Sequence, residues 1–180
     1  MATLTPLWTQ APTSDPLEIQ SFLSARGIAF ETWAMPDEAL ALGRRPQLDE
    51  AGKSRLLELF ADELAEKATS GGYLSADVVA IRPNIPGVAD ALAKFDKVHF
   101  HDDDEVRAIV GGQGVFGLIG DDGRQFLLQM VPGEYVSLPK GIWHWFYCLT
   151  DTNVTALRLF KDNPAWVAHY RSLERGGEGS

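Results

Sequence analysis

The hydrophobic pattern of the chain changes its period near residue 73. Before this point, apolar side chains recur at the spacing of amphipathic helices. A first helix is expected after Asp15-Pro16-Leu17-Glu18, which supplies an N-cap, a proline at N1 and a glutamate at N3, and it should end at Gly27. Further helices are expected over residues 36–42 and 48–68. The pattern therefore predicts a mostly helical layer over residues 1–72.

From Tyr73 onward, short apolar or alternating runs are separated by turn residues, which is typical of strands. A break at residues 83–86 and a short helix at 88–95 interrupt this pattern. Strands are expected at residues 77–81, around 99–101, and at 106–110, 115–119, 125–131, 135–138, 143–149 and 154–160. Short strands with tight turns at nearly even spacing favour an antiparallel sandwich or barrel.

The helical region and the strand region have no obvious linker between them. We therefore expect a single domain over residues 1–180, with the β-barrel at 73–165 and a tail at 166–180. The helical layer should pack on the outside of the barrel. At 180 residues the chain is long enough to bury a sizeable core without disulfide support.

Charge and cysteine content narrow the class of protein. The chain has 16 basic and 25 acidic residues, and its net charge of -9 argues against nucleic acid or an anionic membrane surface as a partner. A single cysteine, Cys148, excludes an internal disulfide and fits a reducing compartment. We expect Cys148 to be buried as a small apolar residue in an aromatic strand. No signal-peptide pattern or bilayer-length apolar run is present, so a cytoplasmic location is expected.

Three of the four histidines form a metal-ligand pattern with one glutamate. Residues two apart in a strand point to the same face, so His99 and His101 can aim both imidazoles at one point. Glu105 follows three aspartates that suit a turn, and His144 would return on a strand folded over the same face. Three imidazoles and a carboxylate suit a first-row divalent metal, and a six-coordinate ion would keep two open positions.

Each of these residues also has a simpler interpretation. A buried histidine is often only a hydrogen-bonded core residue, and an acidic run such as residues 102–105 is usually a solvated turn. The joint spacing inside a β-patterned segment favours the metal site over these alternatives. His169 lies in the tail and is expected at the surface.

Two motifs resemble those of the cupin superfamily. The first is His99-x-His101-x-x-x-Glu105 with Gly111 and Gly114, and the second is Pro132-Gly133-Glu134-x-x-x-Leu138-Pro139-x-Gly141-x-x-His144. Within the cupin superfamily, the chain resembles the bacterial branch of the acireductone dioxygenase family, and the resemblance covers nearly its whole length. The segments that carry this resemblance are residues 95–107, 156–160 and 166–168. Phe100 and Gly112 depart from the family pattern, and neither supplies a ligand.

The resemblance implies a mainly β fold, a cupin antiparallel β-barrel (double-stranded β-helix or jelly roll), and a monomer. It implies cleavage by O2 of the small-molecule acireductone 1,2-dihydroxy-3-keto-5-methylthiopentene in methionine salvage. With Fe(II) the family gives formate and 4-methylthio-2-oxobutanoate. With Ni(II) it gives formate, carbon monoxide and 3-methylthiopropionate.

The resemblance also implies roles for single residues. His99, His101, Glu105 and His144 would bind one Fe(II) or Ni(II), with Glu105 and Arg107 as catalytic residues. Arg107, two residues after Glu105 on the same strand face, matches an arginine that stabilises the anionic substrate. Phe95, Arg107 and Phe146 would line the substrate pocket, with Trp143 and Trp145 pointing to the opposite face. The simpler alternatives are a surface arginine paired with Asp103 or Glu134, and two core aromatic residues.

Two rival functions share the ligand set. One is another cupin metalloenzyme, such as a different dioxygenase or an isomerase, because three histidines and one glutamate recur across the superfamily. The other is a cupin that binds a small molecule or metal without turnover. The features that discriminate among them are Phe95, Arg107, residues 156–160 and the helical layer.

Overall fold

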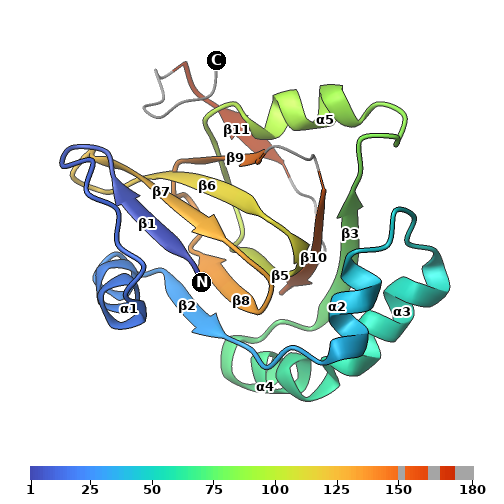
Figure 1. Ribbon diagram of the computed structural model, residues 1–180. Helices are drawn as coiled ribbons and strands as arrows, with labels where there is room; N and C mark the ends of the chain where they lie inside the picture. The colour runs from blue at the N-terminus through green and yellow to red at the C-terminus, as the bar shows by residue number, and fades with distance from the viewer. Residues whose placement is uncertain (150–152, 162–166, 173–180) are drawn as a thin grey trace.

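The fold consists of two antiparallel sheets that face each other, with helices outside them (Figure 1). The computed structural model describes residues 1–149, 153–161 and 167–172. In spatial order, the first sheet contains β1 (Thr3–Pro6), β7 (Gln125–Met130), β6 (Gly114–Ile119), β9 (His144–Cys148), β4 (His99–His101) and β11 (Ala168–Tyr170). The second contains β2 (Ala29–Thr32), β8 (Glu134–Leu138), β5 (Glu105–Gly112), β10 (Val154–Phe160) and β3 (Ser75–Ile81). The predicted mainly β, antiparallel architecture is confirmed.

Two hydrophobic clusters hold the layers together. Between the sheets, Ile109, Phe116 and Phe126 belong to one cluster of buried side chains. The helices α2 (Asp37–Gly43), α3 (Glu50–Leu59) and α4 (Ala61–Gly71) lie outside the second sheet (Figure 1). There Leu42, Leu56 and Phe60 share a second cluster with residues of β5 and β10. The strand period of two thus divides β5 between an inner and an outer core.

The N-terminal region contributes strands as well as helices. β1 pairs with β7 and β2 pairs with β8, so each adds an edge strand to one sheet. Both strands are four residues long, too short for a periodic signal, and their pairing partners lie about a hundred residues away. The helix α1 (Pro16–Ser24) follows the predicted cap, because the Asp15 carboxylate accepts the backbone N–H groups of Leu17 and Glu18 at 2.9 and 3.0 Å.

Two sequence expectations need correction. The single helix expected over residues 48–68 is two helices, α3 and α4, which are separated at Phe60 with φ -111° and ψ 23°. Phe60 is only 1% exposed, so burial of its ring outweighs a continuous helix. The region expected to be a tail contains β11, which pairs with β4. Residues 162–166 and 173–180, including Trp166, lie outside the described residues.

The last helix stands apart from the others. α5 (Val88–Phe95) lies near β9, and its last turn brings Lys94 and Phe95 to the same cavity as the histidines of β4. Within the described residues, no helix has the length and apolar content needed to span a membrane.

A glycine under the buried indole of Trp145 provides a test of this packing. Gly117 of β6 pairs with Trp145 of β9, and a Cβ atom at Gly117 would lie 1.9 Å from the Trp145 ring. Trp145 is 0% exposed, so its ring has little room to move. We expect Gly117→Ala to lower the free energy of unfolding by about 2–3 kcal/mol, measured by urea denaturation.

A smaller ring should relieve this clash. Trp145→Phe alone should also destabilise the protein, because it leaves a cavity. In the double variant, the methyl group added at Gly117 would occupy part of that cavity. The free energy of unfolding of the double variant should therefore fall by less than the sum of the losses in the two single variants. An unchanged free energy of unfolding in Gly117→Ala would show that the indole can shift freely and would contradict the packing argument.

Candidate metal centre

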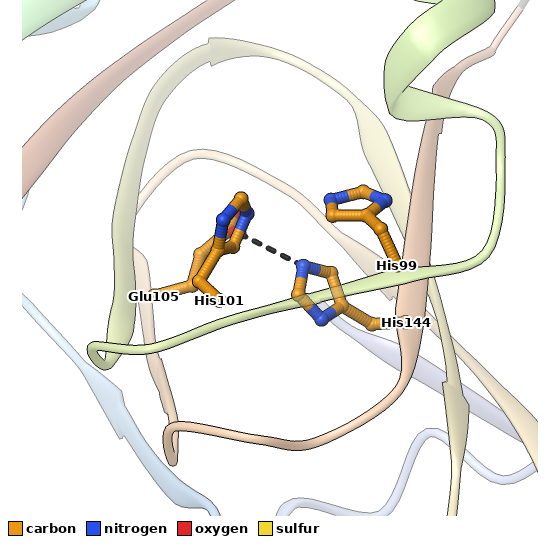
Figure 2. A group of neighbouring side chains, drawn as sticks. All are labelled: His99, His101, Glu105 and His144. Carbon is orange, nitrogen blue, oxygen red and sulfur yellow. Dashed lines mark hydrogen bonds and ion pairs between the residues drawn. The ribbon is translucent and has the colours of Figure 1, made fainter. Parts of the chain in front are cut away.

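Four buried side chains converge from three strands at one end of the sheets. β4 provides His99 and His101, Glu105 is the first residue of β5, and His144 is the first residue of β9. One potential ligand atom from each lies within 4.8 Å of all the others. Figure 2 shows the four side chains grouped around one point. The structure therefore brings together all four of the predicted ligands.

The strand pairing explains this convergence. His99 of β4 is the register partner of His144 of β9, so the two imidazoles lie on one face with their ring centroids 4.4 Å apart. His101 shares that face because it is two residues further along the same strand. The turn at residues 102–104 leads from β4 into β5 of the other sheet, so that Glu105 faces the histidines. Within this turn, the Asp104 N–H donates to the Asp103 carboxylate at 2.8 Å.

Each imidazole is oriented through its Nδ1 atom. Nδ1 of His99 lies 2.6 Å from the carbonyl oxygen of Lys97, and Nδ1 of His144 lies 2.9 Å from that of Ile142. Nδ1 of His101 faces the Val167 carbonyl at 3.3 Å. A carbonyl oxygen only accepts, so these contacts assign a proton to each Nδ1 and leave Nε2 as the nitrogen that faces the centre of the cluster.

The same assignment makes the centre a cation site. The Nε2 atoms of His101 and His144 lie 3.1 and 2.9 Å from Glu105 Oε2. Contacts this short between Nε2 atoms and an anionic oxygen require a cation among them, which is either a proton on Nε2 in the metal-free protein or a metal ion bound by the Nε2 lone pairs. The residues present therefore fit a divalent first-row metal, for which neutral imidazoles and a carboxylate are suitable ligands.

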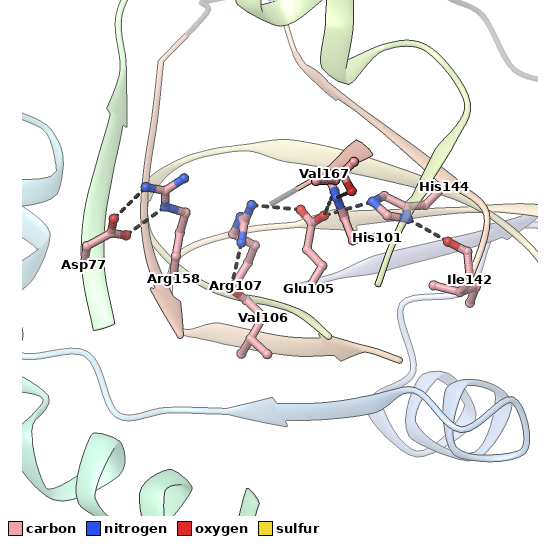
Figure 3. A network of polar contacts seen from close by, with 9 residues as sticks. All are labelled: Asp77, His101, Glu105, Val106, Arg107, Ile142, His144, Arg158 and Val167. Carbon is pink, nitrogen blue, oxygen red and sulfur yellow. Dashed lines mark hydrogen bonds and ion pairs between the residues drawn. The ribbon is translucent and has the colours of Figure 1, made fainter. Parts of the chain in front are cut away.

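Arg107 balances the charge of the glutamate. Its Nη2 atom lies 2.9 Å from Glu105 Oε1, and its Nη1 atom donates to the Val106 carbonyl at 3.0 Å. Burial alone would raise the pKa of Glu105, but Arg107 and His144 outweigh it and hold that pKa well below its usual range. The carboxylate thus offers one oxygen to the histidines and the other to Arg107 (Figure 3).

A cavity of about 260 Å³ opens beside the cluster and is lined by three of the four ligands, His99, His101 and Glu105. Phe95 of α5, Arg107 of β5 and Phe146 of β9, to which the family resemblance assigns a substrate pocket, all line this cavity. Trp143 and Trp145 are not among its lining residues. Trp143 makes an edge contact with Phe100, and Trp145 packs under Gly117.

Arg158 is a pocket residue that sequence reasoning missed. It is the register partner of Arg107 across β5 and β10, and two hydrogen bonds tie it to Asp77 at 2.7 and 2.5 Å. Figure 3 shows Asp77, Arg158, Arg107 and Glu105 in a row across the sheet. The period of two along β10 places Arg158 on the same face as Ala156, which could have identified it.

The remaining two singled-out residues lie away from the ligand cluster. Burial raises the pKa of the Cys148 thiol to about 11, in keeping with packing beside the inner core. The His169 side chain is 42% exposed and contacts Asp102 at 2.8 Å. The expectation that His169 lies at the surface is thus confirmed.

The histidine environment predicts a loss of stability in mild acid for the metal-free protein. Burial, with a smaller contribution from His144, lowers the pKa of His99 from 6.5 to about 4. Between these values the unfolded chain binds a proton at this residue and the folded chain does not. The free energy of unfolding should therefore fall as the pH drops from about 6.5 to about 4.

Urea denaturation of metal-free protein at pH 7 and pH 5 measures this effect. His99→Gln should reduce the difference between the two pH values, because glutamine does not titrate. Equal differences in the two proteins would contradict the assignment of the effect to His99.

Comparison with known proteins places this architecture in a family. The model of the ARD/ARD′ family matches residues 13–168. The chain is 37% identical over 170 residues to an acireductone dioxygenase of Leptospira interrogans, covering 94% of this chain and 96% of that protein. It is 33% identical over 154 residues to an acireductone dioxygenase of Bacillus cereus, covering 86% of this chain and 91% of that one.

A solved structure agrees with the sequence comparison. The acireductone dioxygenase from Bacillus anthracis with a cadmium ion in its active centre superimposes with a TM-score of 0.87 at 30% identity. The match covers 94% of this chain and 98% of that one. The family model, the relatives and the shared fold extend over both cupin-like motifs, so this chain belongs to the ARD/ARD′ family.

Proposed function

We propose that this protein is an acireductone dioxygenase, an enzyme that uses O2 to cleave 1,2-dihydroxy-3-keto-5-methylthiopentene. The observation that carries the proposal is the buried cluster of His99, His101, Glu105 and His144 at the edge of a cavity that also contains Arg107. Family membership and relatives named acireductone dioxygenase support it.

The four ligands would hold one Fe(II) or Ni(II) ion. When bound, such an ion supplies Lewis acidity and a template for the two neighbouring oxygens of an enediolate. A set of three imidazoles and one carboxylate accepts several first-row metals, so metal supply would decide which ion is loaded. In the proposed scheme, the iron form yields formate and 4-methylthio-2-oxobutanoate. The nickel form yields formate, carbon monoxide and 3-methylthiopropionate.

Arg107 is the residue we assign to the anionic substrate. Its guanidinium is buried beside Glu105 and lines the cavity, so its positive charge acts in a medium that screens it weakly. A fixed cation at this place would favour the enediolate over the neutral enediol and hold its charge as electrons move towards O2. Glu105 contributes by keeping the guanidinium oriented through Oε1.

The apolar cavity wall suits the methylthioalkyl end of the substrate. The inner-facing side chains Ile109, Val154 and Ala156 line the cavity together with Phe146. They can exclude water from an electron-rich enediolate and accept an apolar chain. Phe95 lies on the rim, 43% exposed, where we assign it to the substrate entrance.

Several further assignments belong to the same proposal. The reaction would serve methionine salvage in the cytoplasm. The protein would act as a monomer on a small molecule, without nucleic acid or a membrane as partner. The absence of a bilayer-length helix in the described residues and the net charge of -9 are consistent with this setting.

Product analysis tests the reaction. Metal-free protein is loaded with Fe(II) alone and mixed with the acireductone under anaerobic conditions, and O2 is then admitted. Formate and 4-methylthio-2-oxobutanoate should form faster than in the uncatalysed oxidation. The same experiment with Ni(II) should release carbon monoxide. No acceleration at full metal occupancy would contradict the proposal and favour another cupin enzyme or a binding protein.

A further inference from the structure

A polar cluster is centred on the carboxylate of Asp104, in the turn between His101 and Glu105. Its Oδ2 atom accepts the Tyr73 hydroxyl at 2.9 Å and the Lys161 ammonium at 2.7 Å. Its Oδ1 atom accepts the backbone N–H of Lys140 at 3.1 Å. The Asp104 side chain is 16% exposed, and Tyr73 also contacts Ser137 at 3.0 Å. Asp104 therefore connects three segments that are distant in sequence.

One of these connections joins the two segments that carry the metal ligands. Asp104 lies in the turn between His101 and Glu105, whereas Lys140 precedes His144 by four residues. A second hydrogen bond runs in parallel, from the Gly141 N–H to the His101 carbonyl at 2.9 Å. The positive φ of Gly141, +81°, belongs to the tight turn that presents both N–H groups to the first segment.

The direct ladder between the strands that carry the histidines is short. The ladder between β4 and β9 contains one register pair, His99 with His144. Glu105 pairs with Leu138 at the end of β8, six residues before His144. Because this direct ladder is short, the Asp104 bridge adds a constraint on where His144 lies relative to Glu105, beside the ladders that β5 forms with β8 and β9 forms with β6.

We propose that Asp104 is a positioning residue of the metal centre. It holds the segment of His101 and Glu105 against the segment of His144, and Tyr73 and Lys161 hold Asp104 in place. Asp104, Tyr73 and Lys161 are not among the residues that line the cavity beside the ligands. Their influence on the metal therefore passes through the backbone segments that they connect. The inference rests on the metal centre and does not depend on the reaction catalysed.

Metal release provides the test, with Ni(II) as the probe. Metal-loaded protein is mixed with an excess of a chromophoric chelator at 20 °C, and the rate of nickel transfer is followed by absorbance. We expect Asp104→Ala to release Ni(II) about 10–100-fold faster, in the range seen when outer residues of metal sites are removed. Asp104→Asn keeps an acceptor for the Lys140 N–H, so its nickel release rate should lie between those of the parent protein and Asp104→Ala.

Distant and matched variants separate positioning from general damage. Tyr73→Phe removes only the hydroxyl that donates to Asp104, and it should also speed up nickel release. Combined with Asp104→Asn, it should add less than its separate effect, because both act through one carboxylate. Asp102→Asn removes the same charge from the same turn at an exposed residue, and its release rate should stay within about twofold of the parent protein.

The outcomes are distinguishable from simple unfolding and from failure of the proposed reaction. Thermal unfolding of each metal-free variant shows that release is measured on folded protein, and Tyr73→Phe provides the answer if Asp104→Ala does not fold. Unchanged release in Asp104→Asn and Tyr73→Phe would overturn the proposal. Equal acceleration in Asp102→Asn would do the same, since it would point to the charge of the turn. Neither result involves substrate, so both are independent of the product analysis.

Discussion

His144→Ala is expected to abolish stoichiometric binding of Fe(II) and to reduce turnover on the order of a thousandfold. A bound metal supplies several kcal/mol of charge stabilisation, and each 1.36 kcal/mol corresponds to a factor of ten in rate. His144 is 2% exposed, lies opposite His99 and has its Nε2 atom 2.9 Å from Glu105. A water molecule in the space left by the imidazole would be a weaker ligand.

Iron content and turnover should be measured together on this variant. His169→Ala is the matched control, because His169 is exposed and contacts Asp102 rather than the cluster. It should retain both iron and activity. Full iron binding and full activity in His144→Ala would show that the metal assignment is wrong.

Arg107→Ala should have the opposite signature, with metal retained and turnover reduced. We expect kcat to fall about 100–1,000-fold, which is the usual loss when one group that stabilises a developing anion is removed. The guanidinium contacts Glu105 Oε1, while Oε2 faces the histidines, so the ligand oxygen is not removed with the arginine. Arg107→Lys keeps the positive charge but loses the planar guanidinium group, and its kcat should lie between those of the parent protein and Arg107→Ala.

Metal analysis beside steady-state kinetics distinguishes the two roles of Arg107. Arg124→Ala is a suitable control, because the Arg124 side chain is 60% exposed and lies outside the cavity lining. Loss of metal from Arg107→Ala would indicate that the arginine maintains the fold of the centre and would contradict its assignment to the substrate.

The antiparallel architecture could be predicted because turn residues and strand patterns are local signals. Glycine-, proline- and aspartate-rich turns mark the ends of the strands from β5 to β10, and most boundaries agree within one or two residues. The very short strands β1, β2 and β11 lack such a signal. They exist as strands because an exposed ladder on β7, β8 or β4 accepts their backbone groups.

The break between α3 and α4 has a similar origin. Residues 48–68 have a helical pattern throughout, and nothing in their local spacing distinguishes one helix from two. Phe60 is drawn into the outer core beside Leu56 and Trp33, and its backbone leaves helical geometry there. Tertiary burial thus overrides local propensity at this residue.

Local patterning was enough to predict the types of the ligands and the strand face shared by His99 and His101, since a period of two along one strand requires no partner. The folded arrangement was needed to show that His144 pairs with His99, and that the carboxylate of Glu105 divides its oxygens between the histidines and Arg107. It also decided that Arg158 faces the pocket and that Asp104 bridges to Lys140. These contacts depend on the register between strands that are distant in sequence, and register is set by the packing of both sheets at once.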